Sequence, residues 1–253
     1  MTDERIILQL SPRSKTSSKV NLRHTILMVE LATVASTTIV IWRTYGLRRV
    51  IRYLAGLTTA LATQRAFLSA MIRKIGPEQS SLADGLTLCR AATGAVLAGL
   101  VTSGICDRKG IAGWTGWLMP LLGVTDWLDG SIARHVGSTR LGGMLDIEAD
   151  SWLTLWCAAG AVAWGDLPRW CLLSPIIHYL DPLLALLQGK LPQGGGPWWS
   201  RIVGASQMGL LIVALAPIDW RQRKQMLTAA SLPVISGQCA AIVVLLVRKL
   251  REG

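Results

Sequence analysis

The sequence predicts an all-α membrane protein: a polytopic bundle of six core transmembrane helices that follows an N-terminal extension. Of its 253 residues, 51% are hydrophobic and only 16% are charged, and the mean hydropathy is +0.42. A water-soluble domain of this length usually carries more charge. Apolar runs that approach the roughly 20 residues needed to cross a bilayer recur through the second two thirds of the chain. None of them alternates with the period of a barrel strand, so backbone hydrogen bonding in lipid requires helices.

The core helices are expected in a domain that covers residues 81–253. Short links rich in turn formers and charges separate the apolar runs, such as residues 106–110 and 188–197. Several of the 11 Trp residues lie near the expected helix ends, where the membrane interface favours them. The six predicted spans are residues 86–105, 111–136, 143–164, 170–187, 202–218 and 227–247.

Residues 1–80 form an extension of a different character. Its first 75 residues carry 12 basic and 3 acidic side chains. Residues 26–42 are an apolar run interrupted by Glu30, at the lower limit of length for a span, so both a crossing and a surface helix stay open. Residues 47–75 have apolar side chains at helical spacing and basic residues on another face. This segment is either an amphipathic helix held at the membrane surface by anionic lipid or a connector helix packed on the bundle.

The charge distribution predicts an integral protein of the cell (inner) membrane, with both ends of the six-helix core in the cytoplasm. This orientation places most basic residues of the core inside, as the positive-inside rule requires. Arg221, Arg223 and Lys224 would then lie outside, against the rule. If residues 26–42 also span, the basic N-terminus would lie outside as well. Anionic lipid accounts for the net charge of +11, so no nucleic-acid partner is expected.

Four aspartates form the most informative pattern in the sequence. Asp126 and Asp129 are three residues apart, and Asp146 and Asp150 are four apart, so each pair shares one helix face. The link between the two helices is short, and the four acids are therefore expected to converge. An isolated carboxylate in a membrane costs roughly 2.5 kcal/mol or more, and a divalent cation is the natural compensation. Oxygen ligands without a Cys or His cluster favour Mg²⁺ or Mn²⁺.

These aspartates stand in a longer motif that also contains small residues and an arginine at fixed places. The motif comprises Asp126, Asp129, Gly130, Ala133, Arg134, Gly142, Asp146 and Asp150, and Thr87 and Arg90 stand near the start of the first core helix. The pattern resembles the signature of the CDP-alcohol phosphotransferases, membrane enzymes that make phospholipid head groups, over about residues 82–250. It departs from that signature in a loop of seven rather than eight residues before Gly142 and in Asp84, where Asn is usual. Around residues 200–208 the match is loose, with Arg201 and Gln207 in register.

The resemblance implies a reaction in which an alcohol attacks the lipid-side phosphorus of a CDP-linked lipid and expels CMP. Diacylglycerol is the expected lipid, and the active site is expected to face the cytoplasm. Two divalent ions, Mg²⁺ or Mn²⁺, would bridge the pyrophosphate. Asp126, Asp129 and Asp146 would supply metal ligands. Asp150 would take the alcohol proton as general base while also touching a metal.

The resemblance also implies which residues contact the substrates. Gly130 and Ala133 lack bulk, so the nucleotide can approach their helix closely. Arg134 would pair with phosphate oxygens, although an arginine at a helix end is also a common lipid anchor. Arg140 and Arg201 would hold an anionic acceptor such as a polyol phosphate, and a positive-inside role explains them equally well. The predicted substrate-binding residues are Gly130, Ala133, Arg134, Gly142, Thr87, Arg140 and Arg201.

Two other functions stay open at this point. A divalent-cation transporter or channel would use the same acids as its site, although a cation path has no need of Arg134 beside its ligands. An inactive homologue kept as a membrane scaffold is disfavoured by the intact acids. His178 and Asp181 form either a polar contact between helices or a proton relay. The acceptor alcohol stays open, as does the choice between a single chain and a homodimer.

Overall fold

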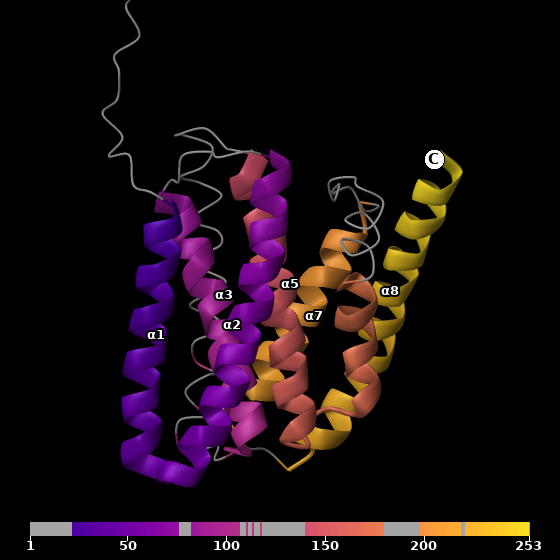
Figure 1. Cartoon of the computed structure of the whole chain (residues 1–253). Coiled ribbons are helices and arrows are strands. Elements are labelled where there is room, and N and C mark those ends of the chain that lie inside the picture. The colour runs from indigo at the N-terminus through magenta and orange to yellow at the C-terminus, as the bar shows by residue number, and fades with distance from the viewer. Residues whose placement is uncertain are drawn as a thin grey trace, which may run out of the picture.

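The computed structural model describes residues 22–75, 82–106, 140–179, 198–218 and 221–252, together with Gly110, Gly113 and Trp117. Within these residues the regular elements are helices and there is no strand, which confirms the all-α fold class. The elements are α1 (Leu22–Tyr45), α2 (Leu47–Ile75), α3 (Leu82–Ser103), α5 (Arg140–Ala163), the 3₁₀ helix η1 (Arg169–Leu172) that leads into helical residues 173–179, α7 (Ser200–Leu215) and α8 (Arg223–Glu252). They stand side by side as an elongated bundle (Figure 1).

Four predicted core spans coincide with described helices, namely α3, α5, α7 and α8. A fifth, residues 170–187, begins in η1 and is described only as far as residue 179, and residues 111–136 lie almost wholly outside the described part. The helices differ from the apolar runs mainly at their ends. α8, for example, begins at Arg223 and ends at Glu252. Helical hydrogen bonding continues through charged flanking residues, whereas an apolar run stops at the first charge.

Two described helices are long and apolar enough to cross a membrane, at Ile26–Tyr45 in α1 and Arg223–Arg248 in α8. Thr87–Ser103 and Ser200–Leu215 are apolar but shorter. Large apolar side chains of α1, such as Met28, are exposed, as expected for a helix that faces lipid. The arrangement of six core spans stays a prediction.

α1 and α2 form an antiparallel hairpin that turns at Gly46, where φ is +80° (Figure 1). α2 packs along α3 and buries Tyr53 and Leu57 completely. One face of residues 47–75 is therefore packed on the bundle, and the contact of the segment with anionic lipid stays a prediction. Because α2 runs back beside α1, the start of α1 lies at the same end of the bundle as the starts of α3 and α5. The earlier expectation was that a spanning segment at 26–42 would put the N-terminus on the outer side, because only one crossing would precede the core. The structure has two antiparallel helices there, so the start of α1 lies at the same end as the start of the core.

An ion pair joins the two helices of this hairpin. The Arg65 guanidinium in α2 lies 3.2 Å from a Glu30 carboxylate oxygen in α1. Glu30 is the charge that interrupts the apolar run of residues 26–42. Since an ionised group in lipid is stabilised by a partner of opposite sign, this pair removes the main objection to a membrane-crossing α1.

α3 occupies the middle of the bundle, with α2 on one side and α5 on the other. Small residues allow this close packing. A Cβ atom on Gly94 would lie 2.9 Å from the Trp152 ring of α5, and one on Gly99 would lie 2.5 Å from the Tyr53 ring of α2. Glycine at both positions lets the neighbouring helices approach α3, as is common where helices pack in membranes. α3 is thus held firmly on two sides.

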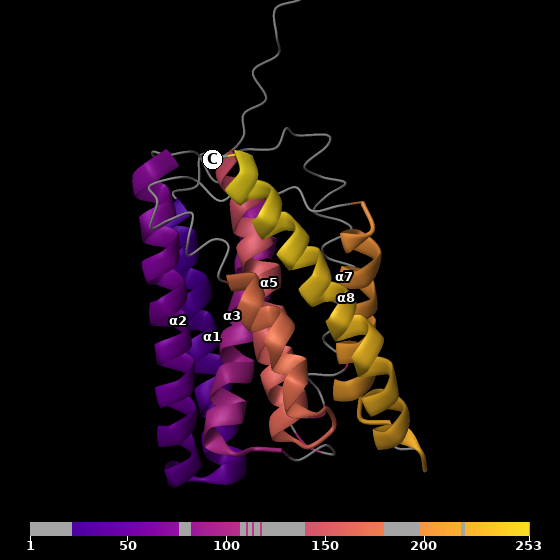
Figure 2. The ribbon, with the colours of Figure 1, turned by 90° about the vertical axis from the view of Figure 1, so that its right-hand side faces the viewer.

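α7 ends and α8 begins at the end of the bundle away from the starts of α3 and α5 (Figure 2). The buried Arg223, at the first position of α8, connects these elements. The Arg223 guanidinium donates hydrogen bonds to the carbonyl oxygens of Val213 and Ala214 and to that of Ala216, at 3.1, 2.5 and 3.0 Å. It also lies 3.8 Å from the Asp166 carboxylate in the turn after α5. These contacts satisfy carbonyls that the end of α7 leaves without helical partners. Arg223 is one of the three basic residues expected outside, against the positive-inside rule. Its charge is balanced by Asp166 and its role is structural, so it does not count as a free positive charge on that side.

Replacing Arg223 with Ala should lower the free energy of unfolding by about 3 kcal/mol, because the Asp166 carboxylate would stay buried without its cation. Thermal unfolding of the purified protein in detergent measures the change. Lys224→Ala is the matched control, since Lys224 is the next residue and is exposed. Equal losses of stability in the two variants would contradict the role of Arg223.

Candidate active site

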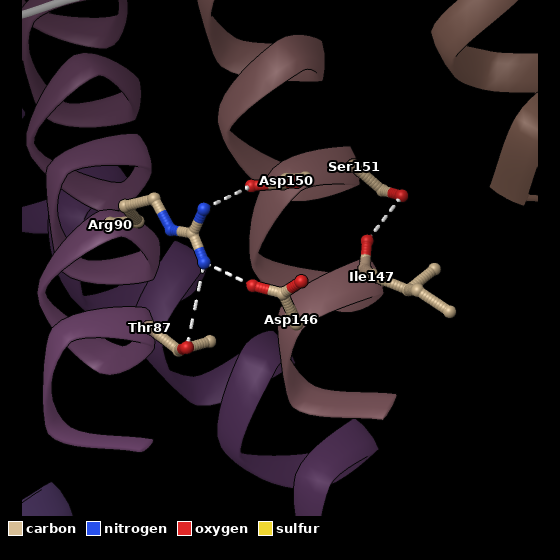
Figure 3. Close-up of polar contacts among 6 residues, drawn as sticks. All are labelled: Thr87, Arg90, Asp146, Ile147, Asp150 and Ser151. Atoms are coloured by element: carbon tan, nitrogen blue, oxygen red, sulfur yellow. Dashed lines mark hydrogen bonds and ion pairs between the residues drawn. The ribbon is translucent and has the colours of Figure 1, made fainter. Parts of the chain in front are cut away.

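The centre of the candidate site is the side chain of Arg90, which projects from α3 toward α5 (Figure 3). One terminal nitrogen forms an ion pair with Asp146, and the other lies 3.1 Å from an Asp150 carboxylate oxygen. The first nitrogen is also 3.5 Å from the Thr87 hydroxyl, one turn earlier on α3. A single guanidinium therefore links two carboxylates on α5 to a hydroxyl on α3.

The local sequence explains this convergence. Asp146 and Asp150 are four residues apart in α5, so their side chains share one helix face. Thr87 and Arg90 are three apart in α3 and share a face in the same way. The close approach of the helices at Gly94, one turn beyond Arg90, brings the two faces together. The Arg90 side chain is only 2% exposed, whereas those of Asp146 and Asp150 are 42% and 43% exposed. The acids therefore remain accessible from the side away from α3.

A cavity of about 400 Å³ lies beside Asp150. Residues of α3, α5, α7, α8 and the helical segment 173–179 line it, so it reaches between the helices of the second half of the bundle. Its volume falls within the range of small-molecule sites. More than half of the lining residues have polar side chains, which are Arg90, Asp150, Ser151, Thr154, Ser174, His178, Gln207 and Gln238.

The structure brings together three of the predicted site residues, namely Thr87, Asp146 and Asp150. Arg140 and Gly142 lie in the first turn of α5, ahead of both acids. Arg201 is exposed at the start of α7 and is not among the residues that line the cavity. The other predicted residues lie outside the described part of the chain, so the convergence of all four aspartates stays a prediction. These residues are Asp126, Asp129, Gly130, Ala133 and Arg134.

Two of the four predicted metal ligands, Asp146 and Asp150, lie among the described residues. Among them there is no group of three or more His, Cys, Asp or Glu side chains that could hold a metal ion. Asp146 and Asp150 nevertheless fit a hard divalent cation, because they present two accessible carboxylates from one helix face. In this structure Arg90 provides the positive charge that compensates them.

One comparison with known proteins identifies the family. The model of the CDP-alcohol phosphatidyltransferase family matches residues 80–250. The chain belongs to this family. The match confirms the resemblance seen in the sequence, and it covers α3 to α8 but not the α1–α2 hairpin. Members of the CDP-alcohol phosphatidyltransferase family are membrane-associated transferases that act on CDP-alcohols. No curated protein and no solved structure matches the chain.

Within this family domain, the residue that sequence reasoning missed is Arg90. It stood in the motif near the start of the first core helix, three residues after Thr87, but was given no role. That spacing on one helix face was the available signal. Glu148, by contrast, lies on another face of α5 as its spacing predicts, where it is buried and accepts a hydrogen bond from the Tyr179 hydroxyl at 3.3 Å. His178 lines the cavity, and its expected partner Asp181 lies outside the described residues.

Replacing Arg90 with Ala should lower the free energy of unfolding by about 2 kcal/mol, because two neighbouring carboxylates would lose the cation that joins them to α3. Arg90→Lys should recover only part of the loss, since an ammonium lacks the planar fork that reaches both acids. Arg73→Ala, at an exposed position of α2, is the control. Unchanged thermal unfolding of the Arg90→Ala variant in detergent would contradict the central place of this contact.

Proposed function

We propose that this member of the family is a divalent-metal-dependent enzyme that transfers a phosphatidyl group from CDP-diacylglycerol to an alcohol and releases CMP, in phospholipid synthesis. The observation that carries the proposal is the convergence of Asp146 and Asp150 on one face of α5, beside a cavity of substrate size. Both features lie within the residues that the family model matches.

The metal site would be formed by two pairs of carboxylates. Asp146 and Asp150 are half of it, and Asp126 and Asp129 would complete it from the preceding core helix. Bound Mg²⁺ or Mn²⁺ would supply positive charge at the pyrophosphate oxygens of the CDP-linked lipid. Carboxylate oxygens are the ligands that such hard ions prefer.

Asp150 is the proposed general base. It lines the cavity and lies one turn deeper in α5 than Asp146, so an alcohol in the cavity can reach its carboxylate. The contact with Arg90 at 3.1 Å holds that carboxylate in place. The alcohol oxygen forms the new bond to the lipid-side phosphorus, its proton passes to Asp150, and the bond from phosphorus to CMP breaks.

The nucleotide would lie on the side of the acids formed by the signature residues. Gly130, Ala133 and Gly142 would allow close approach of the nucleotide, and Arg134 would pair with its phosphate oxygens. Thr87, which lies beside Arg90, would contribute a hydroxyl at the same place. The enzyme would reside in the cell (inner) membrane, with this end of the bundle facing the cytoplasm. Basic residues of the N-terminal extension that lie at this end, such as the exposed Arg73 at the end of α2, would meet anionic lipid.

The family match, which covers residues 80–250, argues against the alternative of a divalent-cation transporter. Arg90 pairs with the two acids in either case and does not by itself decide between these functions. In a transferase the same arginine orients the acids beside an anionic substrate, where positive charge is an advantage.

Chelation should abolish CMP release from CDP-diacylglycerol, since the proposed ligands act only through a bound cation. Added Mg²⁺ or Mn²⁺ should restore the activity, and Zn²⁺ should restore it poorly because all the ligands are carboxylates. CMP is measured after incubation of the purified protein with the lipid and a panel of alcohols. Full turnover after exhaustive EDTA treatment would remove the metal from the mechanism.

Substitution of individual acids should separate metal ligand from base. Asp129→Asn should weaken CDP binding at fixed Mn²⁺ as well as turnover, because a neutral amide is a poorer ligand for a divalent ion. Asp150→Asn should lower turnover by a factor of about 100 or more, the scale of a lost proton transfer, while much of the CDP affinity stays. Calorimetric titration with CDP compares the two variants.

Two outcomes would count against this division of roles. Equal loss of CDP affinity in both variants would show that Asp129 and Asp150 do the same work. Wild-type turnover in Asp150→Asn would exclude this residue as the base.

A further inference from the structure

A small hydrophobic cluster lies at the end of the bundle that carries Asp146 and Asp150. Its buried members come from four helices and are each between 5% and 7% exposed, namely Ile26 of α1, Leu68 of α2, Leu88 of α3 and Leu145 of α5. The start of α1, the end of α2 and the starts of α3 and α5 all lie at this end (Figure 1). The cluster therefore joins the α1–α2 hairpin to both helices of the candidate active site.

Two members of the cluster are next to site residues in the sequence. Leu88 follows Thr87 directly, and Leu145 comes directly before Asp146. Leu88 and Arg90 are two residues apart, so they project from roughly opposite sides of α3. The hairpin thus packs on the side of α3 away from Arg90, at the level where Arg90 reaches α5.

The α1–α2 hairpin is itself held together close to this cluster. The Glu30–Arg65 ion pair, at 3.2 Å, lies about one turn from Ile26 in α1 and about one turn from Leu68 in α2. The partly buried Val29 also packs against the cluster. The family model begins to match at residue 80, so the hairpin side of this contact belongs to a part of the chain that the model does not cover.

We propose that Leu68 is a positioning residue, and that through this cluster the hairpin sets the distance between α3 and α5 at the contact of Arg90 with the two acids. The inference rests on the proposed transferase function, because it gives the hairpin a role in the same site. Leu68 is not among the residues that line the cavity, so it acts only through the helices that it holds. A displacement of reacting groups by about 1 Å lowers turnover by a factor on the order of 100, and a small shift of α5 is therefore enough.

A purely structural role of the hairpin is the alternative, and another leucine of α2 separates the two. Leu57 is completely buried in a second hydrophobic cluster. Its neighbour Gly56 packs closely on α3, where a Cβ atom would lie 2.8 Å from the carbonyl oxygen of Ala98, about two turns beyond Arg90. Leu57 precedes Leu68 by about 16 Å along the helix axis, and it stabilises the bundle away from the acids.

The test compares Leu68→Ala with Leu57→Ala in the purified full-length protein, at a temperature where both variants are folded. The two substitutions remove the same atoms from buried positions of one helix. Leu68→Ala should lower kcat for CMP release from CDP-diacylglycerol at least tenfold, and Leu57→Ala should stay within twofold of the parent protein, although both unfold at a lower temperature. Leu68→Met, which nearly keeps the volume, should recover most of the rate. Values of kcat within twofold of each other in the two alanine variants would overturn the inference.

The coupling between Arg90 and Asp146 provides a second measurement, which needs neither substrate nor metal. It is obtained from the unfolding of Arg90→Met, Asp146→Asn and the double variant, and it should fall by at least half in the Leu68→Ala background but stay unchanged with Leu57→Ala. Leu68→Val and Leu57→Val replace the alanine pair if either alanine variant does not fold. Unchanged coupling in both backgrounds would overturn the inference and leave the transferase function standing. No CMP release from the parent protein with any alcohol would overturn the proposed function, and the coupling would still decide the inference.

Discussion

The contact of Arg90 with Asp146 and Asp150 is the constraint on which the rest of the site depends. Two carboxylates one turn apart repel each other, and a buried guanidinium is unfavourable without anions. Each side therefore needs the other, and together they fix the register between α3 and α5. The small residues of α3 allow the helices to come close enough for this contact. The accessible side of the acids then faces the space where a metal and a phosphate ester would bind.

The same principle of paired charge appears at two other places among the residues that the structure describes. Glu30 meets Arg65 within the α1–α2 hairpin, and Asp166 meets Arg223 where α7 passes into α8. An isolated charge inside a membrane is energetically unfavourable, and here each charge is compensated by a partner of opposite sign on a neighbouring element. Only at Arg90 is the partner a pair of accessible acids, and this distinguishes the candidate active site from the two structural contacts.

Periodicity and spacing predicted the parts of this structure that depend on local sequence. The apolar runs located α3, α5, α7 and α8, and the spacing of four placed Asp146 and Asp150 on one face. The direction of α2 could not be predicted, since an amphipathic helix has the same pattern whether it packs on protein or on lipid. Arg90 and Asp146 are 56 residues apart in the sequence, so their contact depends on the packing of α3 against α5 and could not be predicted from local spacing. The packing of Leu68 in one cluster with Leu88 and Leu145 has the same origin.

A double-mutant cycle on Arg90 and Asp146 tests the central claim most directly. Unfolding free energies in detergent are measured for Arg90→Met, Asp146→Asn and the double variant, and compared with the parent protein. A pair that joins α3 to α5 should show a coupling free energy of about 1.5 kcal/mol or more, because contacting residues of opposite charge are not additive. A coupling of less than about 0.5 kcal/mol, the range expected for independent sites, would contradict the account.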